Sequence, residues 1–396
     1  MPGKGGISLR LSEPRIKPLE EADWTEVERA LLGPIKEERG SVPNIYRTFA
    51  RHPELFTPRL NFGRHLQRES TLPARDREVL INRIAWLSNA EYEWSAHTRL
   101  GRAAGLSEED IERIAAGPEA QGGRDFDRTL LRATDELFID TMIGDSTWQA
   151  LSQSYDTHQM MDLTMTVGGY HMLAMALNSF GVQLQDGASG FPPAGERRAA
   201  VPNGRAAMPT RLSEPRIAPI SQESWSDEER ELLEGLVESR GYIPNVFGTL
   251  ANHPTMYRLW IDFAGQILRR SSLPGREREM LINRIAWLAS GEYEWAAHNP
   301  IGRREGLTDV EIAGLSVGPV DEILNPDDRA LLQAVDELHQ DCFIQTATWE
   351  SLSGRFDDRQ MIDFVLTVGA YKMLAMALNS FGTQLQDGMV GFSGTP

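Results

Sequence analysis

Hydrophobic and polar residues follow one another along this chain with the spacing of amphipathic helices, and no segment shows the strict alternation of a surface strand. In the first half, residues 23–39 predict a helix that stops at Gly40, and Pro43 opens a short helix that breaks at His52. Further helices are predicted from Pro73 through Trp86 and over residues 54–68, 91–105, 107–110, 127–142, 147–155 and 157–185. The sequence therefore predicts an all-α fold.

The same pattern occurs twice. Residues 82–87 read Asn-Arg-Ile-Ala-Trp-Leu and recur unchanged at 283–288, and an offset of 201 residues carries residues 10–191 onto the second half without a gap. A self-match of this length indicates a duplication, so both copies must share one fold. We predict two tandem helical-bundle repeats at residues 10–187 and 211–392, joined by a linker at 188–210 that mixes proline with glycine.

The composition narrows the range of partners. The formal net charge of −17 argues against a nucleic acid and against an anionic membrane surface, because both attract clustered Lys and Arg. Cys342 is the single cysteine, so no intramolecular disulfide can form, and a cytoplasmic location is expected. The most apolar stretch, residues 160–180, contains polar residues and predicts a buried helix rather than a membrane span. Small molecules and protein partners remain.

The strongest candidate for chemistry is a glutamate four residues before a histidine. Glu93 and His97 have this spacing, as do Glu294 and His298, so on a helix each pair shares one face. A carboxylate beside an imidazole fixes its tautomer and raises its pKa, which makes the ring a better base near neutral pH. Catalysis or ligand contact is therefore our interpretation of the two histidines. The alternative is that each is a core residue hydrogen-bonded to its glutamate.

Glu78 and Glu279 are the other acidic candidates. On one straight helix Glu78 and His97 would lie about 28 Å apart. They can cooperate only if the chain folds back near residues 88–90, or if a neighbouring subunit brings them together. Asn89 and its counterpart Ser290 are good N-cap residue types, which predicts a break there and a new helix from residue 91.

The eight histidines show which positions the two copies share. Matched and drifted positions are as follows: His52 with His253, His97 with His298, His65 against Gln266, His158 against Arg359, and His171 against Lys372. His52 and His253 lie at a His-Pro helix break, where a cap or turn role is expected. One His and one Glu per copy fall short of the three protein ligands of a catalytic metal site, so we predict neither a metal nor a cofactor.

Other repeated residues have two possible roles. Arg83 and Arg284 would either clamp a substrate carboxylate or form solvated or internal ion pairs. The aromatic residues of the repeated motif would either line a substrate pocket or pack in the core: Trp86, Tyr92, Trp94, Tyr293 and Trp295. Gly168 and Gly369 are expected to permit close helix approach, and the methionine-rich runs that follow them are expected to pack.

Four segments together resemble the carboxymuconolactone decarboxylase family, which also contains alkylhydroperoxidase-like proteins. They are Val42-Pro43-Asn44, the Leu72-Pro73 helix start, the motif at 91–97, and Ala104-Gly105-Leu106-Ser107. The resemblance covers nearly the whole of both repeats and implies a helical fold used twice. Because family members commonly form trimers or hexamers, it also implies that the two halves pack as a pseudo-dimer and that tandem chains associate, as a trimer in the simplest case.

The resemblance separates two branches of chemistry. The peroxidase-like branch carries a Cys-x-x-Cys pair before its histidine, and here those positions are Ala90 and Glu93, so thiol peroxidase chemistry is excluded. The decarboxylase branch has a Glu four residues before its histidine and an Arg two residues after it, which Glu93, His97 and Arg99 match. In the second repeat Pro300 replaces the arginine.

The resemblance implies a cofactor-free acid/base lyase that acts on a small carboxylated or lactone-type molecule. In this hypothesis His97 moves a proton at the carbon that loses CO2, Glu93 orients the ring and Glu78 relays the proton. Arg83 or Arg99 holds the carboxylate. An isomerase or another lyase would use the same parts, and a ligand-binding or assembly protein that has lost its chemistry is the alternative from another class.

The second site is expected to differ from the first. A proline at position 300 removes the arginine and disfavours a helical Asn299, so the second site is expected to be altered in shape. The first repeat is therefore the better candidate for catalysis.

Overall fold

The computed structural model describes residues 11–192, 212–319 and 324–392. Most of the predicted linker therefore lies outside the described residues. The first repeat contains α1 (Glu26–Arg39), α2 (Asn44–Phe49), α3 (Pro53–Arg64), α4 (Ala74–Leu87), α5 (Glu91–Ala103), α6 (Glu108–Ala116), α7 (Asp125–Asp140), α8 (Asp145–Ser152) and α9 (Thr157–Phe180). The second contains α10 (Asp227–Arg240), α11 (Asn245–Leu250), α12 (Pro254–Arg269), α13 (Gly275–Leu288), α14 (Glu292–Arg304), α15 (Asp309–Val317), α16 (Pro326–Asp341), α17 (Thr346–Ser353) and α18 (Asp358–Phe381). The described residues contain no strand, and the all-α prediction is confirmed.

Local sequence signals explain where many helices begin and end. At α1, Thr25 and Glu28 form a capping box, and Gly40 ends the helix with a φ of 77°. Ser107 caps α6 in the same way, as the sequence predicted. Asp156 forms a capping box with Gln159 at the start of α9. The helices of the second repeat begin with equivalent boxes at α10, α15 and α18.

Several predicted boundaries were displaced, including the following three. Pro73 is the N-cap residue of α4 and not its first residue. The helix predicted over 54–68 ends at Arg64 and continues as a π-helical turn, η2, at His65–Glu69. The last helix of the first repeat ends at Phe180, because Gly181 has a φ of 70° and terminates it.

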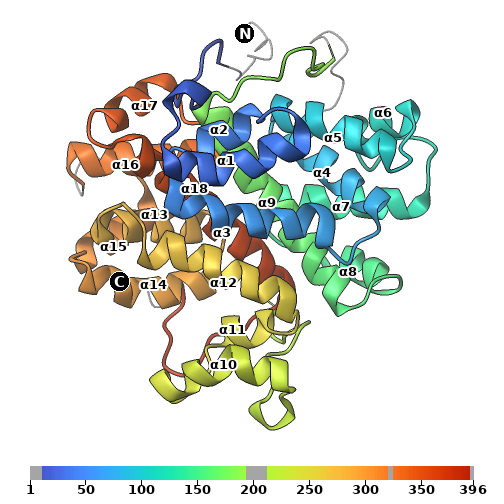
Figure 1. Ribbon diagram of the computed structural model, residues 1–396. Helices are drawn as coiled ribbons and strands as arrows, with labels where there is room; N and C mark the ends of the chain where they lie inside the picture. The colour runs from blue at the N-terminus through green and yellow to red at the C-terminus, as the bar shows by residue number, and fades with distance from the viewer. Residues whose placement is uncertain (1–10, 193–211, 320–323, 393–396) are drawn as a thin grey trace, which may run out of the picture.

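The two repeats pack on each other along their longest helices, α9 and α18, in the middle of the molecule (Figure 1). Gly168 of α9 faces Met373, and Gly369 of α18 faces Met172. A Cβ atom added at either glycine would lie 2.6 Å from the Cγ atom of that methionine. Glycine at these positions therefore permits the close approach, as predicted, and the methionines are packing residues.

A reciprocal set of polar contacts closes the same junction. Arg15 of the first repeat donates to the carbonyl oxygen of Ile344 at 2.7 Å, and Arg216 of the second donates to that of Ile143 at 2.7 Å. Each repeat thus binds a loop of the other repeat through an arginine at the equivalent position. Among the described helices, α18 is long and apolar enough to cross a membrane, but 94% of its most apolar window is buried inside the protein.

Candidate functional site

The chain reverses direction between α4 and α5, and this reversal builds the site. The amide of Ala90 donates to the carbonyl oxygen of Ala85, and Asn89 has a φ of 52°, so the backbone turns sharply before α5. The reversal between Glu78 and His97 is therefore confirmed. The N-cap prediction for Asn89 is wrong: Ala90 is the cap residue and makes no side-chain capping bond, and Ser290 of the second repeat has the same left-handed conformation.

Glu78 on α4 holds His97 on α5. The Nδ1 atom of His97 lies 2.8 Å from Oε2 of Glu78, and both side chains are buried. Because an ionised carboxylate can only accept, Nδ1–H donates, and the neutral ring keeps its lone pair on Nε2. The ring of Tyr170 packs edge-on against the imidazole, with 4.8 Å between ring centroids. The second repeat repeats this geometry with His298 and Glu279 at 2.8 Å.

Glu93 does not orient His97, which corrects the sequence-based assignment. Both carboxyl oxygens of Glu93 are buried and have no hydrogen-bond partner within the described part of the chain. Burial raises the pKa of Glu93 well above its ordinary value, and the positive charge of Arg59 only partly offsets this. Burial therefore favours the protonated form of Glu93, which can donate a proton. Glu294 is buried in the same way, without a partner for its carboxyl oxygens among the described residues.

Glu294 makes the stability of the protein depend on pH. Burial raises the pKa of Glu294 from its ordinary value of 4.5 to about 8, so the folded chain holds this proton more tightly than the unfolded chain. Its contribution to the free energy of unfolding is complete below the unfolded value and is lost as the pH rises through about 8. We expect the melting temperature to fall more steeply between about pH 5 and 9 in wild type than in Glu294→Gln. Parallel pH profiles would contradict this assignment.

A cavity of about 1130 Å³ lies in the first repeat. His97 and Glu93 line it, and so do Tyr92 and Arg99, which the sequence analysis predicted to contact a substrate. Tyr170, which was not predicted, lines it as well. The hydroxyl of Tyr92 accepts a hydrogen bond from Gln185 at 3.3 Å, and Arg99 is exposed. The cavity therefore brings together a base, a protonated acid and a phenol on one concave surface.

Arg59 on α3 also lines this cavity, and sequence reasoning missed it. Its side chain is buried over the ring of Phe49, with 4.0 Å from Cζ to the ring centroid. No ion pair joins it to a carboxylate of the described residues, and its Nε atom has no hydrogen-bond partner there. Burial lowers the pKa of Arg59 to about 10, which leaves it charged at neutral pH. Its counterpart in the second repeat is Trp260, and this difference between the copies was the available signal.

Arg83 and Arg284 are not available to a substrate. Arg83 donates from Nε and Nη2 to Asp135 at 2.6 and 2.9 Å, and from Nη1 to the carbonyl oxygens of residues 114 and 115. Arg284 makes the equivalent pair with Asp336 at 2.7 and 2.8 Å. Both guanidinium groups are thus occupied by partners inside the protein. Arg83 and Arg284 therefore have a structural role, and the hypothesis that they clamp a substrate carboxylate is wrong.

The tryptophans of the motif also belong to the core. Trp86 and Trp94 lie 4.9 Å apart between ring centroids, both pack on Phe191, and neither lines the cavity. Trp295 makes the equivalent contacts in the second repeat and is buried. The hydroxyl of Tyr293 donates to Gln386 at 3.0 Å, which ties it to the chain that follows α18.

Pro300 does not break the helix of the second repeat. Helix α14 runs from Glu292 to Arg304 through Pro300, so the expectation that Asn299 would leave the helix is wrong. Asn299 stays helical and donates to the carbonyl oxygen of Trp295 at 2.6 Å and to Asn283 at 3.2 Å. The substitution removes the arginine and leaves the His298 pair in place.

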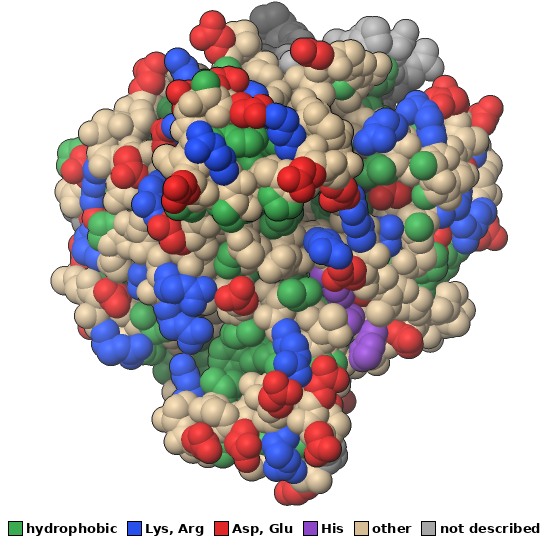
Figure 2. All heavy atoms as spheres, viewed as in Figure 1, with side chains coloured by type: hydrophobic (Ala, Val, Ile, Leu, Met, Phe, Trp, Pro, Cys, Tyr) green, Lys and Arg blue, Asp and Glu red, His purple; other side chains and the backbone are tan. Residues whose placement is uncertain are grey.

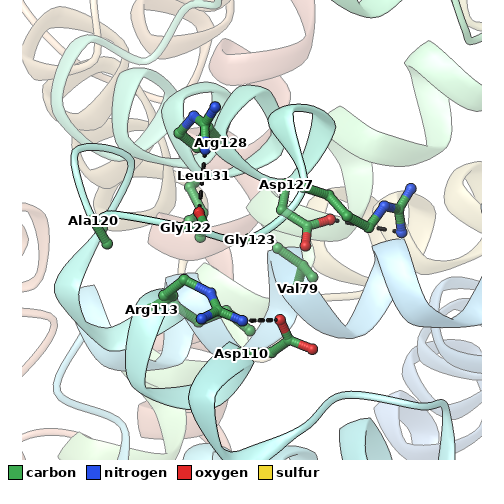
Figure 3. Close-up of a pocket in the computed structure, with 12 residues that line it drawn as sticks. Val79, Asp110, Arg113, Ala120, Gly122, Gly123, Asp127, Arg128 and Leu131 are labelled. Carbon is green, nitrogen blue, oxygen red and sulfur yellow. Dashed lines mark hydrogen bonds and ion pairs between the residues drawn. The ribbon is translucent and has the colours of Figure 1, made fainter.

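A second concave feature lies where α6 and α7 meet (Figure 3). Asp110, Arg113 and Asp127 point into it, and Gly122 accepts a hydrogen bond from Arg128 at 3.1 Å. Its volume is about 10 Å³, which is the space of about one water molecule. It is too small for a metabolite.

Comparison with solved structures returns single-repeat relatives at low similarity. They include an alkylhydroperoxidase AhpD core protein, described as peroxidase-related, from Ralstonia eutropha JMP134, with 21% identity, 43% of this chain and 93% of that chain covered, and a TM-score of 0.38. A peroxidase-related protein from Silicibacter sp. TM1040 has 19% identity, 46% and 96% coverage and a TM-score of 0.39. The debrominase Bmp8 with 2,3,4-tribromopyrrole has 12% identity, 43% and 91% coverage and a TM-score of 0.37.

The family comparison is more specific. The chain has no match among curated proteins. The model of the carboxymuconolactone decarboxylase family matches residues 53–136 and 254–337, which are corresponding positions in the two repeats and include both Glu–His pairs. The chain therefore belongs to the carboxymuconolactone decarboxylase family, as a tandem of two repeats.

Proposed function

We propose that the first repeat holds a cofactor-free acid/base site that acts, like a decarboxylase, on a small carboxylated or lactone-type metabolite. One observation carries the proposal: the same cavity is lined by His97, Glu93 and Arg59. A base, a protonated acid and an unpaired cation are the groups that proton transfer beside a carbonyl requires. An isomerase would use the same three groups, so the reaction subtype is decided by the substrate.

His97 is the group that moves the proton in this proposal. Its Nδ1–H is held by Glu78, which fixes the tautomer and stabilises the imidazolium that forms when Nε2 takes a proton. The buried Glu78 carboxylate acts through the ring and does not need to touch the substrate. This is a positioning role.

Glu93 and Arg59 complete the site. Because burial favours the protonated form of Glu93, this side chain can donate to the enolate oxygen that develops during the reaction. Arg59 makes no ion pair with the described residues, although its charge acts on the nearby Glu93, so a substrate carboxylate is a suitable partner for it. Arg99 lines the same cavity from an exposed position and adds a second positive charge.

The second repeat keeps the Glu–His pair and loses both cations. Trp260 stands where the first repeat has Arg59, and Pro300 stands where it has Arg99. A carboxylated substrate would find no matching positive charge there. We therefore propose one working site per chain, in the first repeat.

A mass-spectrometric screen tests the proposal. Purified wild-type chain is incubated with a panel of carboxylated lactones and β-keto acids, and loss of CO2 or isomerisation is followed. Native mass spectrometry of the same mixtures reports binding without turnover. Turnover of a panel member supports the lyase or isomerase, whereas a bound but unchanged compound would favour the ligand-binding alternative.

Arg59→Gln is expected to weaken substrate binding. A charge-assisted hydrogen bond is worth about 1.5–3 kcal/mol, so KM should rise about 10-fold to 100-fold while the melting temperature changes little. Arg47→Gln on the neighbouring helix α2 is the control, because Arg47 pairs with Glu20 at 3.1 Å and does not line the cavity. Equal KM values for the two variants would remove Arg59 from the site.

A further inference from the structure

The junction between the repeats holds a second cluster of reactive side chains. His65 in η2, Asp162 in α9 and His253 just before α12 come from both repeats, and one ligand atom of each lies within 4.8 Å of the others. All three side chains are buried. None of them lines the cavity beside His97. Figure 2 shows histidine side chains reaching the surface in a narrow strip on this face of the molecule.

The distances within this cluster match a metal coordination sphere. Nε2 of His65 lies 2.9 Å from Oδ1 of Asp162, and Nε2 of His253 lies 3.4 Å from Oδ2. Around a tetrahedral zinc ion with bonds of about 2.0–2.1 Å, neighbouring ligand atoms lie about 3.3 Å apart. Two imidazoles and one carboxylate also form a known zinc ligand set.

Nε2 of His65 is hydrogen-bonded to Oδ1 of Asp162 at 2.9 Å, and a metal ion would replace this bond, whereas the ligand nitrogen of His253 has no such bond. Nε2 of His253 makes no hydrogen bond with the described residues although it is buried, and Nδ1 of His65 is likewise without one. Thr71 donates from its amide and its hydroxyl to Oδ2 of Asp162, at 2.6 and 2.8 Å, and so holds the carboxylate from outside. Nδ1 of His253 accepts from the amide of Met256 at 3.4 Å, as the predicted cap role required. A metal on Nε2 would replace this long contact, because the ring proton would move to Nδ1.

The pseudo-symmetric position shows that the cluster is specific to one side of the junction. There His52 approaches Asp363, with 3.1 Å between Nε2 and Oδ1, and Ser272 holds the carboxylate in place of Thr71. Gln266 takes the place of His65. An amide side chain is a much poorer transition-metal ligand than an imidazole, so only the side with His65 has the full ligand set.

We propose that His65, Asp162 and His253 bind one divalent transition-metal ion, zinc in particular, at the junction of the two repeats. The cation would neutralise the buried Asp162 carboxylate and would join residues from both repeats. His158 is exposed and stacks on the His253 ring with 4.4 Å between centroids, so it marks the solvent side of the cluster, from which a water molecule would supply the fourth ligand.

The test uses the full chain after treatment with EDTA and dialysis. Zinc chloride is titrated by calorimetry, and the bound zinc is counted by elemental analysis. We expect one ion per wild-type chain. His65→Gln should weaken binding at least about tenfold, since even the loss of an outer partner costs about 10–100-fold. This substitution copies Gln266 of the other repeat and is therefore compatible with the fold. His52→Gln, on the pseudo-symmetric side, is the control and should bind as wild type does.

X-ray absorption of the zinc-loaded wild-type chain provides a second measurement that needs no variant. It should report nitrogen and oxygen ligands at about 2.0–2.1 Å, with scattering from two imidazoles. The proposal is overturned if wild type binds no zinc, if His65→Gln binds it equally well, or if the absorption spectrum contains no imidazole. Retained affinity in His52→Gln together with the loss in His65→Gln supports it.

Discussion

Replacing His97 with glutamine lowers kcat/KM for the substrate found in the screen by at least about 100-fold, because positioned acid/base groups contribute about 10²–10⁴-fold. Glutamine can still accept a contact from the cavity side but cannot carry a proton between two partners. Glu78 would also lose the ring that it holds at 2.8 Å. The measurement is initial rate by mass spectrometry, with circular dichroism to verify that the variant is folded.

His298→Gln is the matched control for His97→Gln. It removes the same group from the same helix position in the second repeat, where His298 pairs with Glu279. We expect kcat/KM to stay close to the wild-type value. A loss of activity only in the double variant would mean that both repeats work, and it would contradict the proposal of a single site.

Arg83→Met destabilises the protein by about 3–5 kcal/mol, because breaking a buried ion pair leaves an uncompensated charge. The substitution would strand the Asp135 carboxylate and two main-chain carbonyl groups that Arg83 now satisfies. The measurement is the urea unfolding midpoint followed by circular dichroism. Arg284→Met should produce a loss of similar size, since it breaks the equivalent pair with Asp336.

An exposed ion pair provides the reference for Arg83→Met. Arg102 contacts Glu108 at 2.5 Å on the surface, so Arg102→Met should cost less than about 1 kcal/mol. If Arg83→Met kept wild-type stability and instead raised KM, the arginine would be a substrate ligand after all, and the structural role assigned here would fail.

The parts of the fold that depend on local sequence were predictable. The capping box at Ser107 and the reversal before Glu91 were both read correctly, because they rest on contacts between near neighbours. The break at residue 89 occurs for a different reason from the predicted one: Asn89 tolerates a positive φ, as asparagine often does, and does not cap the helix. The residue type at position 89 therefore predicted the place of the chain reversal correctly, but it did not predict the backbone conformation that produces the reversal.

The partner of His97 could not be decided from spacing. Glu93 shares a helical face with His97, but its carboxyl group is buried without a partner, whereas Glu78 approaches from the neighbouring helix. Spacing along one helix gives the side chains that can meet, and tertiary packing decides which of them do. The same limit applied to Arg59, which reaches the cavity from α3 and has no motif around it.

The cluster at the junction was hidden for a related reason. His65 and His253 belong to different repeats, so counting ligands within one copy found too few. The difference between His65 and Gln266 is visible in the sequence, but the sequence does not show that His65 meets a histidine of the other repeat. When the repeats pack along α9 and α18, His65 lies in the cluster on one side of the junction and Gln266 takes the equivalent position on the other side. This difference gives only one side two histidines.

The packing of α9 on α18 also bears on how this protein can evolve. In a two-fold homodimer one codon serves both sides of the interface, so every mutation acts twice. Here the interface lies within one polypeptide and has two separately encoded sides, such as Gly168 with Met373 and Gly369 with Met172. Covalent linkage keeps the halves together at any dilution. Each side can therefore accept a mutation that the other never receives, and one gene can keep an older function in one half while the other half changes.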